Sequence, residues 1–255
     1  MKQIILIFLI CFVLLLSGCT YDTESLEFEL LENDTYAVVS YIDKEKTSYR
    51  IPKYYNDKLV TEIGKRAFRN NTLLEKVILP DSIVSIGNHA FDGCSQLKKI
   101  NIPEGVTYIG DYAFQTCRSL EKIKLPSGLT KINKGTFVSC KSLESIEIPE
   151  SVIEIGYGAF SNCESMKEIK FPSSLEKIGD YAFMSNLELK SIYIPKTVLY
   201  MGIGVFASCN SLTIYCEADT EPAGWDQVWQ GLGLGIYEVI WGYEKEYKRI
   251  LIYSY

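Results

Sequence analysis

Residues 97–117 read Leu-Lys-Lys-Ile-Asn-Ile-Pro-Glu-Gly-Val-Thr-Tyr-Ile-Gly-Asp-Tyr-Ala-Phe-Gln-Thr-Cys and contain the pattern that decides the fold. The same order of residue types returns every 23 residues from Ile63 to Tyr200, without an insertion or a deletion. A fixed period of this size is typical of a solenoid, in which each unit buries its apolar side against its neighbours. The pattern therefore predicts a stack of similar coils.

Two columns of the repeat indicate how one coil is built. Proline ends a short strand in each unit, because it cannot donate a hydrogen bond in the interior of a sheet. Phenylalanine is expected to fill the core and recurs at Phe68, Phe91, Phe114, Phe137, Phe160, Phe183 and Phe206. The predicted fold class is a mainly β repeat solenoid with coils of 23 residues, short parallel strands and capped ends.

A third column consists of glycine in all repeats but one. Its members are Gly64, Gly87, Gly110, Gly156, Gly179 and Gly202, with Asn133 in the remaining repeat. Asparagine is among the residues that replace glycine most readily in left-handed backbone. We therefore expect a left-handed conformation in this column.

A cysteine column allows two interpretations. Its members are Cys94, Cys117, Cys140, Cys163 and Cys209, and Asn71 and Asn186 stand in the other two coils. Coils about 4.8 Å apart lie within reach of a disulfide, but side chains in register point the same way and asparagine cannot form one. We favour buried free thiols that make weak hydrogen bonds. The Cys-x-x-Cys spacing typical of zinc sites is missing from the column, so no metal is expected.

The N-terminal region predicts export. Lys2 precedes an apolar run from Ile4 to Leu16, and Leu16-Ser17-Gly18-Cys19 resembles the cleavage box of bacterial lipoproteins. Residues 1–18 are therefore interpreted as a lipoprotein signal peptide, with Cys19 lipidated and residues 19–25 as the lipidated tether. An ordinary secretory signal is the alternative, but no small-x-small site fits as well. The expected location is outside the cytoplasm, anchored to the bacterial cell membrane by the lipid alone.

The two ends of the repeat array are predicted to be caps, since one face of each terminal coil must meet water. Residues 26–62 are expected to form an N-terminal β cap, with strands at Leu26–Leu30 and Tyr36–Tyr41 and an outward bulge near residues 54–58. The solenoid is assigned to residues 63–211 and a C-terminal cap to residues 212–242, while the tail 243–255 is left open. Three Trp residues near the C-terminus either close the core, which we favour, or form a platform for carbohydrate.

The consensus Leu-x-x-Ile-x-Ile-Pro-x-x-Val-x-x-Ile-Gly-x-x-Ala-Phe-x-x-Cys resembles the BspA-type (Treponema pallidum-type) leucine-rich repeat of bacterial surface lipoproteins. The resemblance covers residues 63–211 in register and residues 26–62 more loosely, and the segment from Ile214 to Gly242 is similar to a closing segment of that family. It implies a surface interaction module, because some members act as adhesins that bind proteins of host or neighbouring cells. It implies no catalytic residue and no cofactor.

Composition argues against two other classes of function. The net charge of −6 disfavours nucleic-acid binding, which needs clustered Lys and Arg. His89 is the single histidine, and nothing near it in the sequence suggests a nucleophile or an orienting group. Glu144 and Glu147 could mimic a glycosidase pair, but they are expected on an exposed strand. We predict that the chain is not an enzyme.

The outward positions of the strands carry mixed charges and favour a solvated face. The alternative is a basic patch of Lys99, Lys122 and Lys124, flanked by Tyr108 and Tyr112, that meets an acidic partner. The predicted function is non-catalytic, adhesin-like binding of a protein partner on a host or neighbouring cell surface. Binding of a glycan or of the cell wall is the alternative function.

Overall fold

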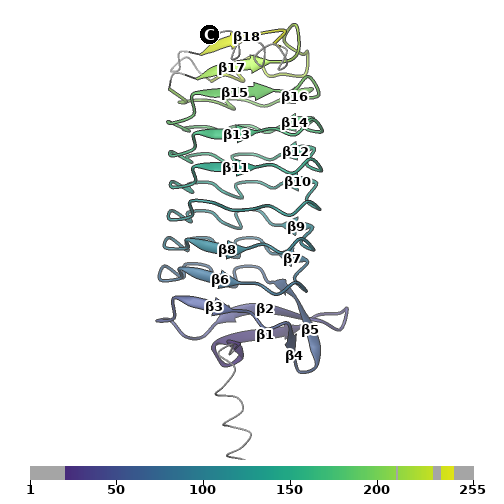
Figure 1. Cartoon of the computed structure of the whole chain (residues 1–255), viewed down its shortest axis with the longest axis vertical. Coiled ribbons are helices and arrows are strands. Elements are labelled where there is room, and N and C mark those ends of the chain that lie inside the picture. Colours follow the sequence, from purple (N-terminus) through teal and green to yellow (C-terminus); the bar gives the residue numbers. More distant parts are fainter. Residues whose placement is uncertain (1–20, 211, 232–236, 244–255) are drawn as a thin grey trace, which may run out of the picture.

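The structure is a computed structural model, and it describes residues 21–210, 212–231 and 237–243. The predicted signal peptide, the lipidation site Cys19 and most of the tail lie outside the described residues. Within them the chain forms a mainly β solenoid of about nine turns that stack along one axis (Figure 1). This arrangement confirms the fold class predicted from the period of 23 residues.

Each coil has three sides, of which two carry strands. The first face contains strands of three or four residues: β3 (Ser48–Arg50), β6 (Lys76–Ile78), β8 (Lys99–Asn101), β11 (Ser145–Glu147), β13 (Glu168–Lys170), β15 (Ser191–Ile194), β17 (Thr213–Cys216) and β18 (Glu238–Ile240). The second face contains β5 (Lys58–Ile63), β7 (Ser85–Ile86), β9 (Tyr108–Ile109), β10 (Lys131–Ile132), β12 (Glu154–Ile155), β14 (Lys177–Ile178) and β16 (Tyr200–Met201). Paired strands within these two faces are parallel, one coil apart, for example β6 with β8 and β12 with β14.

The third side, which we call the turn face, has no strands among the described residues but is still joined by backbone hydrogen bonds. In the six coils from that of Phe68 to that of Phe183, alternate N–H groups donate to the next coil, as from His89 to Asp111, from Phe91 to Ala113 and from Gly93 to Gln115, at 2.8 to 2.9 Å. Two of these alternate positions are left-handed. The first left-handed column is Arg66, His89, Tyr112, Gly135, Gly158, Tyr181 and Gly204.

The glycine column was predicted to be left-handed, and that prediction is wrong. The glycine column lies two residues before the first left-handed column, and none of its described residues has a positive φ. Its glycines are required by close approach of the coils. A Cβ at Gly87 would lie 2.6 Å from the backbone nitrogen of Lys65, and one at Gly110 would lie 2.5 Å from that of Asn88. Glycine is therefore needed here because the backbones of neighbouring coils nearly touch.

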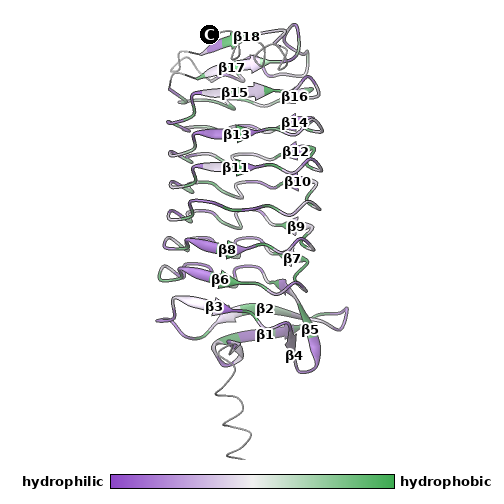
Figure 2. Cartoon of the chain, viewed as in Figure 1, coloured by the Kyte–Doolittle hydropathy of each residue, from purple (hydrophilic) through white to green (hydrophobic). Residues whose placement is uncertain are grey.

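A continuous apolar ribbon runs through the middle of the coils. The seven Phe side chains of the repeat are fully buried, and successive rings stack with centroids 5.3 to 5.8 Å apart. The first face alternates around this ribbon: β11 and β13 bury their central residue and expose the other two. Figure 2 shows the outcome as hydrophilic colour on strands such as β8 and β13.

Both ends of the ribbon are covered. At the N-terminal end β1 (Leu26–Leu30) pairs antiparallel with β2 (Tyr36–Tyr41), and a short 3-10 helix (Thr23–Ser25) precedes them. The expected bulge at residues 54–58 is a hairpin in which β4 (Tyr54–Tyr55) pairs antiparallel with β5. At the other end Trp225 and Trp229 are buried, and Trp229 packs edge-on against Phe206. Two of the three Trp rings are therefore part of the core closure and are not presented to solvent.

The stack is interrupted where the glycine column holds Asn133. At the equivalent position of the coils before and after, the N–H of Gly110 donates to Ile86 and that of Gly156 donates to Ile132. Asn133 instead uses its side-chain Nδ2, which donates to the carbonyl of Ile109 at 2.7 Å. β9 and β10 belong to different sheets, so the strand pairing on the second face is broken where Asn133 replaces glycine.

Candidate functional site

The cysteine column contributes to the core and not to a reactive site. All five thiols are buried, and each Sγ donates to the carbonyl of a Phe in the preceding coil at 3.1 to 3.3 Å. Burial raises the pKa of Cys140 to about 12 and that of Cys209 to about 11. These thiols are unsuited to nucleophilic chemistry because the thiolate is the reactive form.

The only histidine of the sequence is held in a polar cluster. His89 Nδ1 and Arg69 Nε each lie 3.0 Å from Oδ2 of Asp92, whose carboxylate is almost fully buried. Glu144, a candidate for an acid pair, is engaged with Lys167 at 3.2 Å. The expectation that His89 lacks an orienting group is therefore wrong, because Asp92 supplies one. Among the described residues no hydroxyl or thiol group is hydrogen-bonded to the imidazole ring. Within the described residues we find no cluster of side chains that could hold a metal ion.

The predicted basic patch is only partly assembled. Lys99 and Lys122 line one hollow on the first face, of about 450 Å³, together with Lys76 and Lys98. Lys124 turns to Glu104, with Nζ to Oε1 at 2.6 Å, and this hydrogen bond lowers the pKa of Glu104. Tyr108 belongs to the second face and Tyr112 to the turn face. The structure therefore joins two of the three lysines and leaves both tyrosines on other sides of the coil.

A lysine that the sequence analysis did not include completes this surface. Lys76 and Lys99 are direct partners in the parallel pairing of β6 and β8, and Lys122 follows one coil later. These three residues, which we call the lysine column, have no carboxylate within ion-pair distance in the described part of the chain, whereas Lys98 lies 3.3 Å from Glu75. Like charges opposite each other on neighbouring strands are destabilising. A stack of three unpaired ammonium groups is thus a feature that folding alone does not favour.

The turn face carries a second hollow, of about 390 Å³, which we call the tyrosine groove. Its walls are Tyr112, Tyr157 and Tyr181, and Gly135 and Gly158 form its floor with Val138, Ser161, Asn162 and Met184. Tyr112 and Tyr181 stand in the first left-handed column, three coils apart, with the two glycines between them. Reading this column as a mixture of aromatic residues and glycine would have revealed the groove in the sequence.

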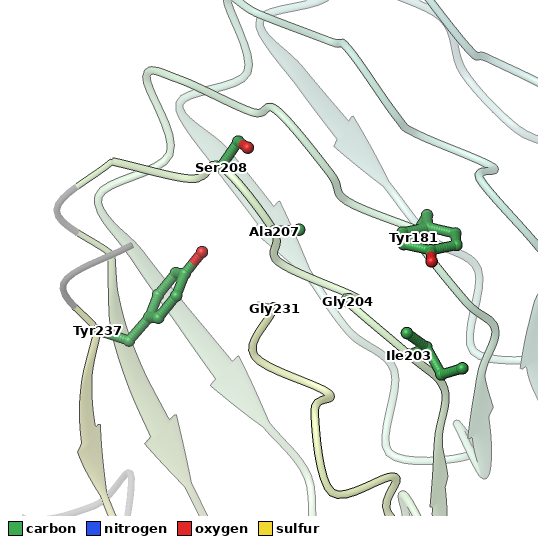
Figure 3. Close-up of a pocket in the computed structure, with 7 residues that line it drawn as sticks. All are labelled: Tyr181, Ile203, Gly204, Ala207, Ser208, Gly231 and Tyr237. Atoms are coloured by element: carbon green, nitrogen blue, oxygen red, sulfur yellow. The ribbon is translucent and has the colours of Figure 1, made fainter. Parts of the chain in front are cut away.

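A smaller pocket of about 110 Å³ lies on the other side of Tyr181. Figure 3 shows Tyr181 and Tyr237 on opposite sides of the segment from Ile203 to Ser208. The hydroxyl of Tyr237 donates to the carbonyl of Phe206 at 2.6 Å. This pocket is small, and Tyr237 on one side of it is held by its hydrogen bond to the core backbone. The tyrosine groove is therefore the larger opening of the two.

Comparisons with known proteins agree with this architecture. The family model described as the BspA type leucine rich repeat region matches residues 61–183 and 130–218, with six copies in all. A leucine-rich cell surface protein from Faecalibacterium prausnitzii is similar in structure, with a TM-score of 0.69 and 30% identity over 81% of this chain, and the match spans 57% of that protein's chain. The Treponema pallidum leucine-rich repeat protein gives a TM-score of 0.66 and 25% identity over 87% of this chain and 100% of its own.

A leucine-rich repeat protein from Bacteroides ovatus is also similar, with a TM-score of 0.52 and 26% identity over 87% of this chain and 71% of its own. A comparison with curated proteins gave no match. Among the described residues, no helix is both long enough and apolar enough to cross a membrane.

Proposed function

The chain belongs to the family of BspA-type leucine-rich repeat proteins, and from that premise we propose that it is a non-catalytic, adhesin-like surface protein that binds a protein partner on a host or neighbouring cell. The observation that supports this proposal is the lysine column of Lys76, Lys99 and Lys122. A partner surface that brings carboxylates to this column relieves the repulsion between the ammonium groups and gains charge-assisted hydrogen bonds. The partner site is therefore acidic.

The hollow between these lysines also offers apolar contact. Ile78 and Ile100 are half-buried and line the same hollow as the three lysines. Binding cores combine such desolvated apolar contacts with a polar rim. The first face of the N-terminal coils is thus the proposed contact surface, in preference to the C-terminal coils, where Lys167 and Lys170 already pair with glutamates.

The test compares two triple variants. Crosslinking on intact bacteria identifies the partner, and its affinity is then measured for two variants. In the first, Lys76, Lys99 and Lys122 are changed to Gln, and in the second the ion-paired Lys124, Lys141 and Lys167, which lie outside the hollow, are changed to Gln. The first variant should bind at least about tenfold more weakly, and it should be as stable as the wild type or slightly more stable. The second variant removes the same charge and should bind normally. Equal loss in both variants, or none in the first, would contradict the proposal.

We also propose that Cys19 carries the lipid anchor of the mature protein. The supporting observation is its position directly after the apolar run and the Leu16-Ser17-Gly18 box. Cells grown with an alkyne-tagged fatty acid should label the wild-type protein and not Cys19→Ala, and the variant should leave the membrane fraction. Labelling that persists in Cys19→Ala would rule out this anchor.

A further inference from the structure

The tyrosine groove on the turn face leaves one position of the first left-handed column, Gly158, uncovered. We call the space above this glycine the open step. The ring of Tyr112 covers Gly135, where an added Cβ would lie 2.3 Å from two ring carbons. The ring of Tyr181 covers Gly204, where a Cβ would lie 2.8 Å from Cε1. At Gly158 the nearest atom to such a Cβ is that of Ser161, 4.0 Å away. The groove is therefore empty above Gly158 and walled by rings on both sides.

Tyr157 and Lys134 shape the open side of this step. The side chain of Tyr157 is 48% exposed and meets the ring of Tyr181 edge-on, with centroids 5.8 Å apart. Lys134 Nζ lies 5.7 Å from the ring centroid of Tyr112 and 5.1 Å from that of Tyr157. No carboxylate in the described part of the chain is within ion-pair distance of this ammonium group. The ring of Tyr112 is packed between His89, with centroids 5.1 Å apart, and Gly135, so Tyr157 supplies the exposed ring of the groove. The groove thus combines one exposed aromatic ring with one ammonium group that no carboxylate of the described residues pairs.

The backbone donors on the floor are already used. The N–H of Gly135 donates to Tyr157 and that of Gly158 donates to Asp180, so both backbone donors serve the stack. The Ser161 hydroxyl is buried and accepts a hydrogen bond from Asn162 at 3.2 Å. An oligosaccharide would lose water from its hydroxyl groups here and would find the backbone donors of Gly135 and Gly158 occupied, which is unfavourable. An apolar side chain with a nearby carboxylate suits the groove better.

We propose that the tyrosine groove binds an extended segment of a partner protein that places a proline or other apolar side chain above Gly158 and a carboxylate beside Lys134. Extended proline-containing segments dock in aromatic-lined grooves because their conformation is preformed. Three coil steps from Tyr112 to Tyr181 span about 15 Å, which matches about five residues of such a segment. This site is on a different side of the coil from the lysine column and does not depend on it.

The experiment selects ligands for the groove directly. The full chain, purified in detergent, is exposed to a phage library of random dodecapeptides, with counter-selection on the variant Gly158→Tyr. That variant fills the open step with a side chain that the same left-handed column already accepts at Tyr112 and Tyr181. The matched control is Arg66→Tyr, which adds the same ring in the same column but outside the groove. Enriched peptides should contain Asp or Glu next to proline or an aliphatic residue.

Affinities of one enriched peptide then test each element of the site. Tyr157→Ala and Gly158→Tyr should each weaken binding at least about tenfold, as for the removal of an aromatic anchor, whereas Arg66→Tyr should not. Lys134→Glu should invert the preference, so that the peptide with its acid changed to Lys binds more tightly. Tyr157 is exposed, so its truncation keeps the test valid if Gly158→Tyr fails to fold.

Three results would overturn the proposal. The first is a library that shows no enrichment on the wild type over Gly158→Tyr. The second is a set of enriched peptides whose binding does not respond to Lys134→Glu. The third is binding to a glycan array that Tyr157→Ala abolishes, since this would assign the groove to carbohydrate.

Discussion

Truncation of Phe137 should divide the solenoid into two independently unfolding halves. Its ring is fully buried between Phe114 and Phe160, with centroids 5.6 and 5.4 Å away. The coil that contains it is joined to the preceding one less completely than other coils. On the second face β9 does not pair with β10, and on the first face residues 122–124 form no strand. The ring stack and the turn-face hydrogen bonds therefore carry most of this junction.

The expected loss follows from the size of the buried group. Phe→Ala in a core costs about 3–5 kcal/mol, and a domain of this kind has a total stability of only about 5–15 kcal/mol. Since each coil is stabilised by its neighbours alone, the loss falls on the junction between the coils of Phe114 and Phe137. We expect the free energy of unfolding to drop by about 3–5 kcal/mol and the two halves to lose their coupling.

The positions of the tryptophans provide the assay. All three, at residues 225, 229 and 241, lie at the C-terminal end, so their fluorescence reports only on that half. Circular dichroism reports on all strands. In urea the two signals should coincide for the wild type and separate for Phe137→Ala, with the fluorescence transition following the C-terminal half.

Phe91→Ala is the matched control, because Phe91 is equally buried and stacked but its coil keeps the pairings of β7 with β9 and of β6 with β8. This variant should lose a similar free energy while both signals still coincide. Coincident transitions in Phe137→Ala, or a loss below about 1 kcal/mol, would refute the reasoning.

Three further predictions concern the buried cysteine column, the interruption of the stack at Asn133 and the carboxylate of Glu154. Burial raises the pKa of Cys140 to about 12, so a thiol reagent at pH 8 should modify this residue only after denaturation, as peptide mass mapping can show. Asn133→Gly should let the coils approach, and hydrogen exchange at residue 133 should slow as its N–H bonds to Ile109. Burial raises the pKa of Glu154, but Lys131 and Lys177 outweigh this and hold it below the ordinary 4.5. Its contribution to stability is thus present above pH 4.5 and lost below it, and urea unfolding of Glu154→Gln should show a weaker loss of stability at acidic pH.

The sequence by itself was sufficient for the architecture because the repeat constrains every coil in the same way. A column of Phe at a constant spacing can be buried only if successive rings align, and the strict period allows no other register. The glycine column shows the limit of this reasoning. The presence of Asn133 in this column suggested left-handed backbone. In the tertiary structure the other coils need glycine at this position because the backbone of the neighbouring coil lies 2.5 to 3 Å from where a Cβ would be.

The binding surfaces depended on the tertiary structure, because they join residues from different coils and different sides. Lys76 was omitted from the basic patch although it stands in the same column as Lys99, and Lys124 was included although its charge is neutralised by Glu104. Tyr112 is close to Lys99 along the chain, yet it faces another side and forms a groove with Tyr157. Sequence spacing fixes which residues share a column, but the direction of each side chain and its ion partners arise only when the coils are stacked.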